Sequence, residues 1–194
     1  MSAQRRVVVG ITGATGAVYA VRLLRRLREA GRETHLIASA AGVLSVHHEL
    51  GLDRRALEQL ADVAYAPGDV GAAIASGSFA IEAMVVAPCS MKSLAAIALG
   101  MGDNLLTRAA DVVLKEQRKL VLMPRETPLH VGHCRLLLQA AEMGAIIAPP
   151  MPAFYNHPRT LEESVDHSVG RVLDLFDIES GLVRRWQGPR GARR

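Results

Sequence analysis

Short apolar runs alternate along the chain with longer stretches in which apolar positions recur at helical spacing. The short runs are apolar throughout, which is typical of strands that are buried on both faces. After the first run, Val18, Val21, Leu24 and Leu27 follow one another with arginines between them, so this stretch predicts an amphipathic helix. Gly31 is placed to end that helix. The predicted strands are Arg6–Ile11, Glu33–Ala38, Ala83–Ala87, Lys119–Met123 and Ala145–Ala148, with a weaker one near Asp62–Tyr65.

The regular alternation of strands and helices predicts an α/β fold, namely a three-layer Rossmann-like or flavodoxin-like domain with a mostly parallel sheet. A chain of 194 residues is long enough for one domain with one core of useful size. No repeat or linker divides the sequence. We therefore expect a single domain over residues 1–180 and a basic, flexible tail over residues 181–194.

The net charge of +4 comes from the end of the chain. Residues 181–194 contain five arginines and no acid, and the remaining 18 of the 23 basic residues are balanced by 19 acidic ones. A near-neutral body argues against a nucleic-acid partner. No apolar stretch approaches the roughly 18 residues of a membrane span. Two cysteines, Cys89 and Cys134, cannot build a disulfide framework, and this favours the reducing cytoplasm.

A glycine-rich loop, Gly10-Ile-Thr-Gly-Ala-Thr-Gly16, joins the first strand to the first helix. Such a loop permits close backbone approach, and the helix start offers free N–H groups to a phosphate, with Thr12 and Thr15 adding hydroxyls. Simple strand–helix packing is the alternative explanation. The second strand ends at Ser39, where a dinucleotide site normally has an acidic residue. The loop therefore favours the terminal phosphate of a mononucleotide.

Polar residues gather at the carboxyl ends of the predicted strands, where doubly wound folds bind their ligands. Ser90 and Ser93 could simply cap the following helix, a role compatible with phosphate contact. Arg125 and Glu126 could form a plain surface pair, although their position at the mouth of a buried strand favours a site. The segments that meet at this edge are Gly13-Ala14-Thr15, Ser39, Pro88-Cys-Ser-Met-Lys-Ser93, Arg125-Glu-Thr-Pro128 and the loop to Phe154-Tyr155.

Other candidates are ambiguous on their own. Arg108, Asp111 and Lys115 share one helix face, which is either a solvated ion-paired stripe or a pair of cations for a phosphate. Arg171 allows the same two interpretations. His130 and His133 lack a third ligand at a telling spacing, so we expect no metal site. Cys89 fits a buried structural thiol better than a nucleophile.

Taken together, these motifs resemble those of the UbiX-type flavin prenyltransferase family. The likeness runs in order over nearly the whole chain, and the Pro-Cys-Ser and Arg-Glu-Thr-Pro segments are more specific than the glycine loop. The matching segments are Gly10-Ile-Thr-Gly-Ala-Thr-Gly-Ala17, Ser76-Gly-Ser-Phe79, Ala87-Pro-Cys-Ser-Met-Lys92, Leu106-Thr-Arg-Ala-Ala-Asp-Val112, Leu114-Lys-Glu116, Arg125-Glu-Thr-Pro-Leu129, Pro149-Pro-Met-Pro-Ala-Phe-Tyr155 and Arg185-Trp-Gln-Gly188.

The resemblance implies a metal-independent, homo-oligomeric flavoprotein, with a dodecamer as the expected assembly. Members of this family join a dimethylallyl group from dimethylallyl monophosphate to N5 and C6 of reduced flavin mononucleotide (FMN). The product, prenylated FMN, is the cofactor of a separate UbiD-type decarboxylase, which is the expected recipient.

The resemblance also implies roles for individual residues. The FMN site would comprise Gly13, Ala14 and Thr15 along the flavin, Ser39 near its phosphate, and Ser90, Met91, Lys92, Ser93 and Arg125. Glu126 would be the acid–base residue. Lys115, with a catalytic role, would hold the prenyl phosphate together with Arg108, Tyr155 and Arg171, with Glu49 nearby and some ligands from neighbouring subunits. Thr15 departs from the family's usual serine, and Ala40 from a lysine of some relatives.

Two other functions stay open at this point. A related FMN-dependent cysteine decarboxylase would have Pro-Ala-Ser-Ala-Asn-Thr where this chain has Pro88-Cys-Ser-Met-Lys-Ser93. A non-catalytic FMN carrier for a decarboxylase would keep the FMN contacts but would not need Glu126, Lys115 or Arg171.

Overall fold

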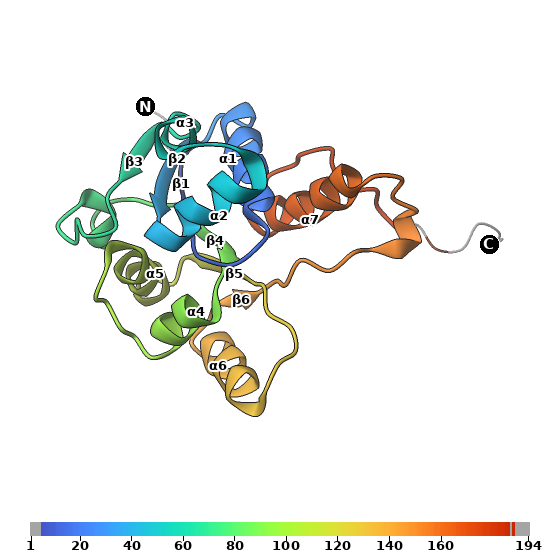
Figure 1. Ribbon diagram of the computed structural model, residues 1–194. Coiled ribbons are helices and arrows are strands. Elements are labelled where there is room, and N and C mark those ends of the chain that lie inside the picture. The colour runs from blue at the N-terminus through green and yellow to red at the C-terminus, as the bar shows by residue number, and fades with distance from the viewer. Residues whose placement is uncertain (1–4, 187, 189–194) are drawn as a thin grey trace.

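The computed structural model describes residues 5–186 and residue 188. Its centre is a six-stranded sheet in the order β3-β2-β1-β4-β5-β6, and every paired strand is parallel to its neighbour. This arrangement confirms the predicted α/β class (Figure 1). The strands are β1 (Arg6–Ile11), β2 (Glu33–Ala38), β3 (Val63–Tyr65), β4 (Ala83–Cys89), β5 (Lys119–Pro124) and β6 (Ile146–Ile147).

Helices cover both faces of the sheet and make the three layers. Buried residues of α1, α2, α3 and α7 pack in one core cluster, and those of α4, α5 and α6 pack in the other. The helices are α1 (Ala17–Glu29), α2 (Ala40–Leu50), α3 (Arg54–Glu58), α4 (Met91–Ala98), α5 (Leu105–Lys115), α6 (Val131–Glu142) and α7 (Leu161–Leu175), and short 3₁₀ turns occur at η1 (Ala73–Ala75) and η2 (Phe154–Asn156).

Continuous apolar strands arise because each face of the sheet needs its own set of side chains. In β1, Val7 and Val9 belong to the core cluster with α1 and α7, whereas Val8 belongs to the opposite cluster. All three valines are fully buried, as is the whole of β4. This double burial is what the unbroken apolar runs predict.

Element ends differ slightly from the sequence prediction. The β4 strand continues to Cys89, and β6 is shortened to two residues. The α1 helix ends at Glu29, and Gly31 has a φ of 68°, a left-handed conformation that suits the predicted glycine stop.

The proposed boundary between a domain and a flexible tail stays a prediction. Residues 187 and 189–194 of that tail lie outside the described residues. Within the part of the chain that the structure describes, no helix is long and apolar enough to cross a membrane.

Strand order fixes where a ligand site belongs. From β1 the chain moves to β2 on one side, whereas from β4 it moves to β5 on the other. The carboxyl ends of β1 and β4 therefore flank the point at which the winding reverses, and this is where doubly wound folds open a crevice for ligands.

Candidate functional site

Hydrogen bonds join the loops at the carboxyl edge of the sheet. The Ser39 N–H donates to the carbonyl of Ile11 at 2.9 Å, which links β2 to β1. The Arg125 N–H donates to the carbonyl of Cys89 at 3.2 Å, which links β5 to β4. The segments after β2, β1, β4 and β5 thus form one continuous rim, as the sequence predicts for Ser39, Ser90 and Arg125.

Thr12 makes the central link of this rim. Its hydroxyl donates to the carbonyl of Pro88 at 2.9 Å and accepts from the Ser90 N–H at 2.7 Å. The side chain is buried, so the expectation that this hydroxyl serves a phosphate is wrong: both of its bonds bind β1 to β4. Thr15, in contrast, is exposed and keeps its predicted place beside the rim.

Serines that follow two of the strands cap helices, a role that the sequence offered for Ser90 but not for Ser39. The Ser39 hydroxyl accepts from the Gly42 N–H at the start of α2. The Ser90 hydroxyl accepts from the Ser93 N–H at the start of α4 and donates to the Ser93 hydroxyl. Two helix starts, each with a positive end of the helix dipole, therefore point at the same rim.

Gly13 allows the glycine loop to approach α2 closely. A Cβ at this position would lie 2.5 Å from the Cβ of Ala41, so only glycine fits. The loop therefore leaves backbone, without side chain, where β1 turns towards α1. This feature suits contact with a flat ligand, although close helix packing alone also accounts for the glycine.

Glu49, near the end of α2, occupies the start of α1. Its carboxylate accepts hydrogen bonds from the N–H groups of Gly16, at 3.0 and 3.1 Å, and Ala17, at 2.8 Å. These are N–H groups that the glycine loop was expected to offer to a phosphate. Because a carboxylate already takes them, a bound phosphate would use the starts of α2 and α4 instead.

A hollow of about 550 Å³ opens beside the glycine loop. Thr15, Glu49 and Arg125 line it, together with Pro150 and residues from the start of α7. Tyr19 lies on the same wall, where burial raises the pKa of its hydroxyl and the positive charge of Arg125 partly offsets that rise. Sequence patterns missed Tyr19, because it reads as one more residue of an amphipathic helix.

Glu126 lies next to Arg125 and is exposed. One carboxylate oxygen accepts from the Thr127 N–H at 3.0 Å, and this bond keeps the side chain at the end of β5. The carboxylate is therefore at the rim, where the sequence predicts it.

Lys115 and Arg108 lie apart from the hollow. The α5 helix runs back to the amino edge of the sheet, so Lys115 precedes the start of β5 and pairs with Glu116. Lys115 lowers the pKa of the Glu116 carboxyl through a hydrogen bond and its charge. Arg108 pairs with Asp111 at 2.7 Å. Neither cation lines the hollow beside the glycine loop.

Tyr155 and Arg171 form a third group, on η2 and α7. In Figure 1, α5 and the η2–α7 region lie on opposite sides of the molecule. Arg171 lines a hollow of about 330 Å³ between α7 and the segment after β6, and it pairs with Asp174 at 2.9 Å. Asp174 went unnoticed in the sequence, although its position one helical turn after Arg171 was a usable signal.

Two other candidates have structural explanations. Cys89 is fully buried, and burial raises the pKa of its thiol to about 12, so it is not a nucleophile at neutral pH. His130 caps α6 by accepting from the His133 N–H, and the two rings lie against each other, tilted by 30° with centroids 3.6 Å apart. Among residues 5–186 and 188, no group of three or more His, Cys, Asp or Glu side chains is arranged to hold a metal ion.

Comparison with known proteins agrees with this geometry. The sequence model of the Flavoprotein family matches residues 1–167. A probable UbiX-like flavin prenyltransferase from Bacillus subtilis (strain 168) is 57% identical over 183 residues, which cover 94% of this chain and 90% of the relative. The chain belongs to the UbiX-like flavin prenyltransferase family.

Solved structures extend the UbiX-like assignment to the fold. AnUbiX (PadA1), crystallised in complex with FMN and dimethylallyl pyrophosphate, superposes with a TM-score of 0.94 at 46% identity, covering 96% of this chain and 99% of that one. A dodecameric FMN-dependent UbiX-like decarboxylase from Escherichia coli O157:H7 superposes with a TM-score of 0.91 at 50% identity, covering 94% and 100%.

Proposed function

We propose that this protein is a flavin prenyltransferase that joins a dimethylallyl group from dimethylallyl monophosphate to N5 and C6 of reduced FMN. The observation that carries the proposal is the rim at the switch point, where four loops are hydrogen-bonded together beside a hollow that contains Arg125 and Glu49. A family relative with the same fold was crystallised with FMN and dimethylallyl pyrophosphate.

The residues of the rim fit FMN. Gly13, Ala14 and Thr15 would lie along the flavin, and the start of α2 at Ser39 would take the phosphate. Ser90, Met91, Lys92, Ser93 and Arg125 would complete the contacts from α4 and β5. When bound in its reduced form, FMN supplies the nucleophilic N5. The chain itself positions the ring and excludes water.

The prenyl phosphate requires cations, because cleavage of an allylic C–O bond transfers negative charge to the departing phosphate. Lys115, Arg108 and Arg171 would bind that phosphate together with Tyr155, with Glu49 nearby. Glu126 would handle protons during ring closure, a task that a solvent-accessible carboxylate at the rim can perform.

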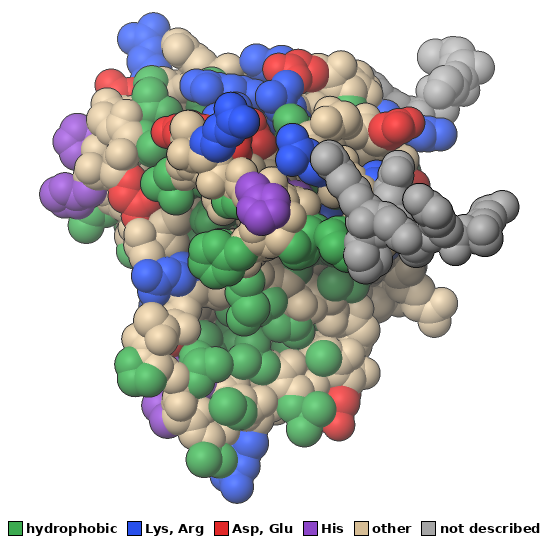
Figure 2. Space-filling model, turned by 90° about the vertical axis from the view of Figure 1, so that its right-hand side faces the viewer, with side chains coloured by type: hydrophobic (Ala, Val, Ile, Leu, Met, Phe, Trp, Pro, Cys, Tyr) green, Lys and Arg blue, Asp and Glu red, His purple; other side chains and the backbone are tan. Residues whose placement is uncertain are grey.

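These ligands need neighbouring copies of the chain, because α5 and η2–α7 lie on opposite sides of a single molecule (Figure 1). Hydrophobic side chains also gather on the face seen in Figure 2, as expected for a surface that is covered in an assembly. Apolar residues of α6 and the segment after β6 are largely exposed, among them Val131 at 66%, Met151 at 71% and Phe154 at 78%. A homo-oligomer, dodecameric as in one relative, would join the three groups.

Prenylated FMN would pass to a UbiD-type decarboxylase. We place this exchange in the cytoplasm, because both cysteines are free thiols and a reducing compartment keeps them so.

The test is the mass of the flavin after incubation of the purified protein with reduced FMN and dimethylallyl monophosphate. We expect the released flavin to gain the mass of one dimethylallyl unit. The Glu126→Gln variant should bind FMN but turn over roughly 100-fold more slowly. A flavin of unchanged mass with the unaltered protein would instead support a non-catalytic FMN carrier.

A further inference from the structure

The chain returns along α7 after Ile178, and residues 180–186 form a strap on that helix. Arg185 anchors the strap: its two terminal nitrogens donate to the two carboxylate oxygens of Asp174, at 2.7 and 2.8 Å. The Asp174 side chain is only 14% exposed. A two-pronged pair between a guanidinium and a mostly buried carboxylate is among the stronger polar contacts in proteins.

The same carboxylate also holds Arg171. A terminal nitrogen of Arg171 donates to Asp174 Oδ2 at 2.9 Å, the oxygen that also accepts from Arg185. Two guanidinium groups therefore share the Asp174 carboxylate, and Glu179 adds a second negative charge near Arg185. Because 55% of the Arg171 side chain is exposed, few other contacts limit its conformations. Asp174 is thus what orients it.

Gly170 shows that the strap packs tightly on the helix. A Cβ at this position would lie 2.7 Å from Cγ2 of Val183 and 2.9 Å from Cβ of Leu182. Glycine inside a helix costs about 1 kcal/mol relative to alanine. The close approach of the strap explains why this buried helical position carries glycine.

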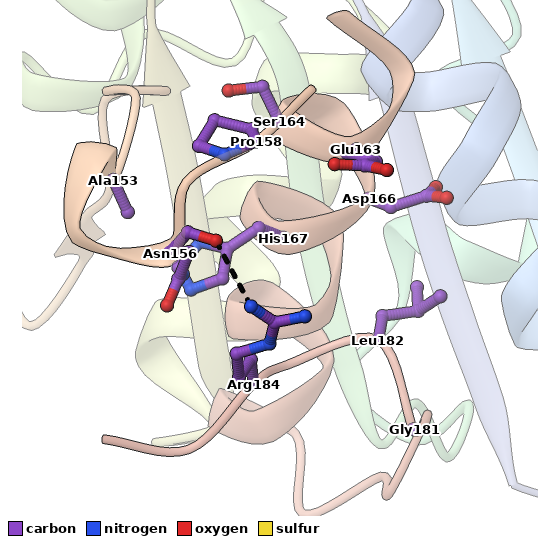
Figure 3. Close-up of a pocket in the computed structure, with 10 residues that line it drawn as sticks. All are labelled: Ala153, Asn156, Pro158, Glu163, Ser164, Asp166, His167, Gly181, Leu182 and Arg184. Atoms are coloured by element: carbon purple, nitrogen blue, oxygen red, sulfur yellow. Dashed lines mark hydrogen bonds between the residues drawn. The ribbon is translucent and has the colours of Figure 1, made fainter. Parts of the chain in front are cut away.

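The residues on either side of Arg185 reach η2. Arg184 donates to the carbonyl of Asn156 at 3.4 Å, across a pocket of about 260 Å³ that α7, η2 and the strap enclose (Figure 3). The Trp186 ring packs edge-on against Tyr155, with centroids 5.7 Å apart and an interplanar angle of 78°. Two consecutive strap residues, Arg185 and Trp186, therefore link Asp174, which holds Arg171, with Tyr155.

We propose that Asp174 is a positioning residue of the substrate site, which acts by docking the strap on α7 so that Arg171 is oriented and Trp186 lies against Tyr155. The inference rests on the proposed function, because there Arg171 and Tyr155 bind the prenyl phosphate. Asp174 itself does not touch the substrate. It sets the affinity for dimethylallyl monophosphate, not the rate of the chemical step.

The first variant removes the charge of Asp174. Trp186 is the only tryptophan of the chain, so the decay of its fluorescence anisotropy reports directly on the strap. In Asp174→Asn we expect a new sub-nanosecond motion of the indole, as for an undocked segment. With reduced FMN in excess, the KM for dimethylallyl monophosphate should rise about tenfold while kcat changes less than about twofold. The Asp174→Glu variant retains the negative charge, so it should keep most of the rigidity of the indole and most of the low KM of the unaltered protein.

The second variant displaces the strap without altering any charge. Gly170→Ala favours the helix but collides with Leu182 and Val183. The fast motion of the indole should appear again, with a smaller rise in KM because the pair between Asp174 and Arg171 survives. Asp177→Asn is the matched control: this carboxylate is 84% exposed and pairs with Lys119, so both readouts should stay unchanged.

Three results would overturn the proposal. One is an indole as rigid in Asp174→Asn as in the unaltered protein. Another is a mobile indole with an unchanged KM. The third is a fall in kcat and in thermal stability at constant KM, which is the behaviour of a merely structural residue. If the unaltered protein makes no prenylated flavin, the proposed function fails separately, and the anisotropy and the calorimetric affinity for dimethylallyl monophosphate still decide whether Asp174 docks the strap and tunes binding.

Discussion

The rim proposed to bind FMN and the residues proposed to bind the prenyl phosphate are built in opposite ways. The rim is completed within one chain, where the buried Thr12 hydroxyl joins β1 to β4 and backbone bonds add β2 and β5. The phosphate-binding cations are half-buried or exposed, lie on opposite sides of the molecule, and each pairs with an acidic residue close by in the sequence. Folding of one chain preorganises the rim, whereas the proposed phosphate site would be completed only by assembly of several copies.

The difference explains the ion pairs. Arg108 pairs with Asp111, Lys115 with Glu116 and Arg171 with Asp174. Unpaired cations brought together from several copies would repel one another when no phosphate is bound. A local acid on each helix offsets that repulsion and limits side-chain motion, at little net gain in stability for the exposed pairs.

The largest expected effect is on turnover, when one copy of the chain carries a damaged rim and another copy carries a damaged phosphate site. Glu126→Gln damages the rim and Lys115→Gln damages the phosphate side, and each pure variant should lose roughly 100-fold in turnover. If the two regions of one site come from different copies, oligomers reassembled from an equal mixture should regain about one quarter of the activity, because that share of sites receives both intact residues.

The control is the double variant carrying both changes, mixed with unaltered chains in the same ratio. In the mixture of the two single variants, activity that stays at the level of the pure variants after reassembly would show that Lys115 and Glu126 act within one chain. The phosphate site would then not be divided between copies.

A smaller effect, on the free energy of unfolding, is expected from replacing Thr12 at the centre of the rim. Thr12→Val keeps the shape of the side chain but leaves the Ser90 N–H without its partner, and the Pro88 carbonyl keeps only the hydrogen bond from the Thr12 backbone N–H. A buried unpaired polar group costs about 1–3 kcal/mol, so the free energy of unfolding, measured in urea, should fall by about 2 kcal/mol and FMN affinity should fall with it. Thr12→Ser retains the hydroxyl and is the control. Equal stability of the two variants would remove Thr12 from this role.

Local patterns predicted most of the fold, because burial on both faces leaves unbroken apolar runs such as Val7–Val9 and Ala83–Ala87. They also offered the helix cap at Ser90, since capping is the commoner role of a serine after a strand, but not the cap at Ser39. The strand at β6 was predicted two residues too long: the Ala145 N–H donates back to Ala140 of α6, and Ala148, although its N–H donates to the Leu122 carbonyl, lies just beyond the paired residues.

Contacts between distant segments were out of reach of these patterns. The sequence around Glu49 does not indicate that its carboxylate accepts from the Gly16 N–H. The sequence around Thr12 does not indicate that its hydroxyl bonds to Pro88 and Ser90. The placement of Lys115 and Arg171 on opposite sides follows only from the direction of α5 and the path after β6. The strap on α7 was missed for the same reason, because Gly170 becomes informative only when Leu182 and Val183 are seen against it.

The smallest expected effect on stability comes from removing one of the proposed phosphate-binding cations. If the phosphate-binding cations serve assembly and substrate instead of folding, removing one should hardly change the stability of the chain. Arg108 is a suitable choice, since its pair with Asp111 is about one-third exposed on both sides, at 38% and 36%. Exposed pairs of this kind contribute about 0–1 kcal/mol. Arg108→Gln should therefore shift the free energy of unfolding by less than about 0.5 kcal/mol while weakening the binding of dimethylallyl monophosphate, as urea unfolding and calorimetry would measure. A loss of stability as large as that of Thr12→Val would mean that Arg108 belongs to the folded framework, and the division between a preorganised rim and an assembled phosphate site would not hold at this position.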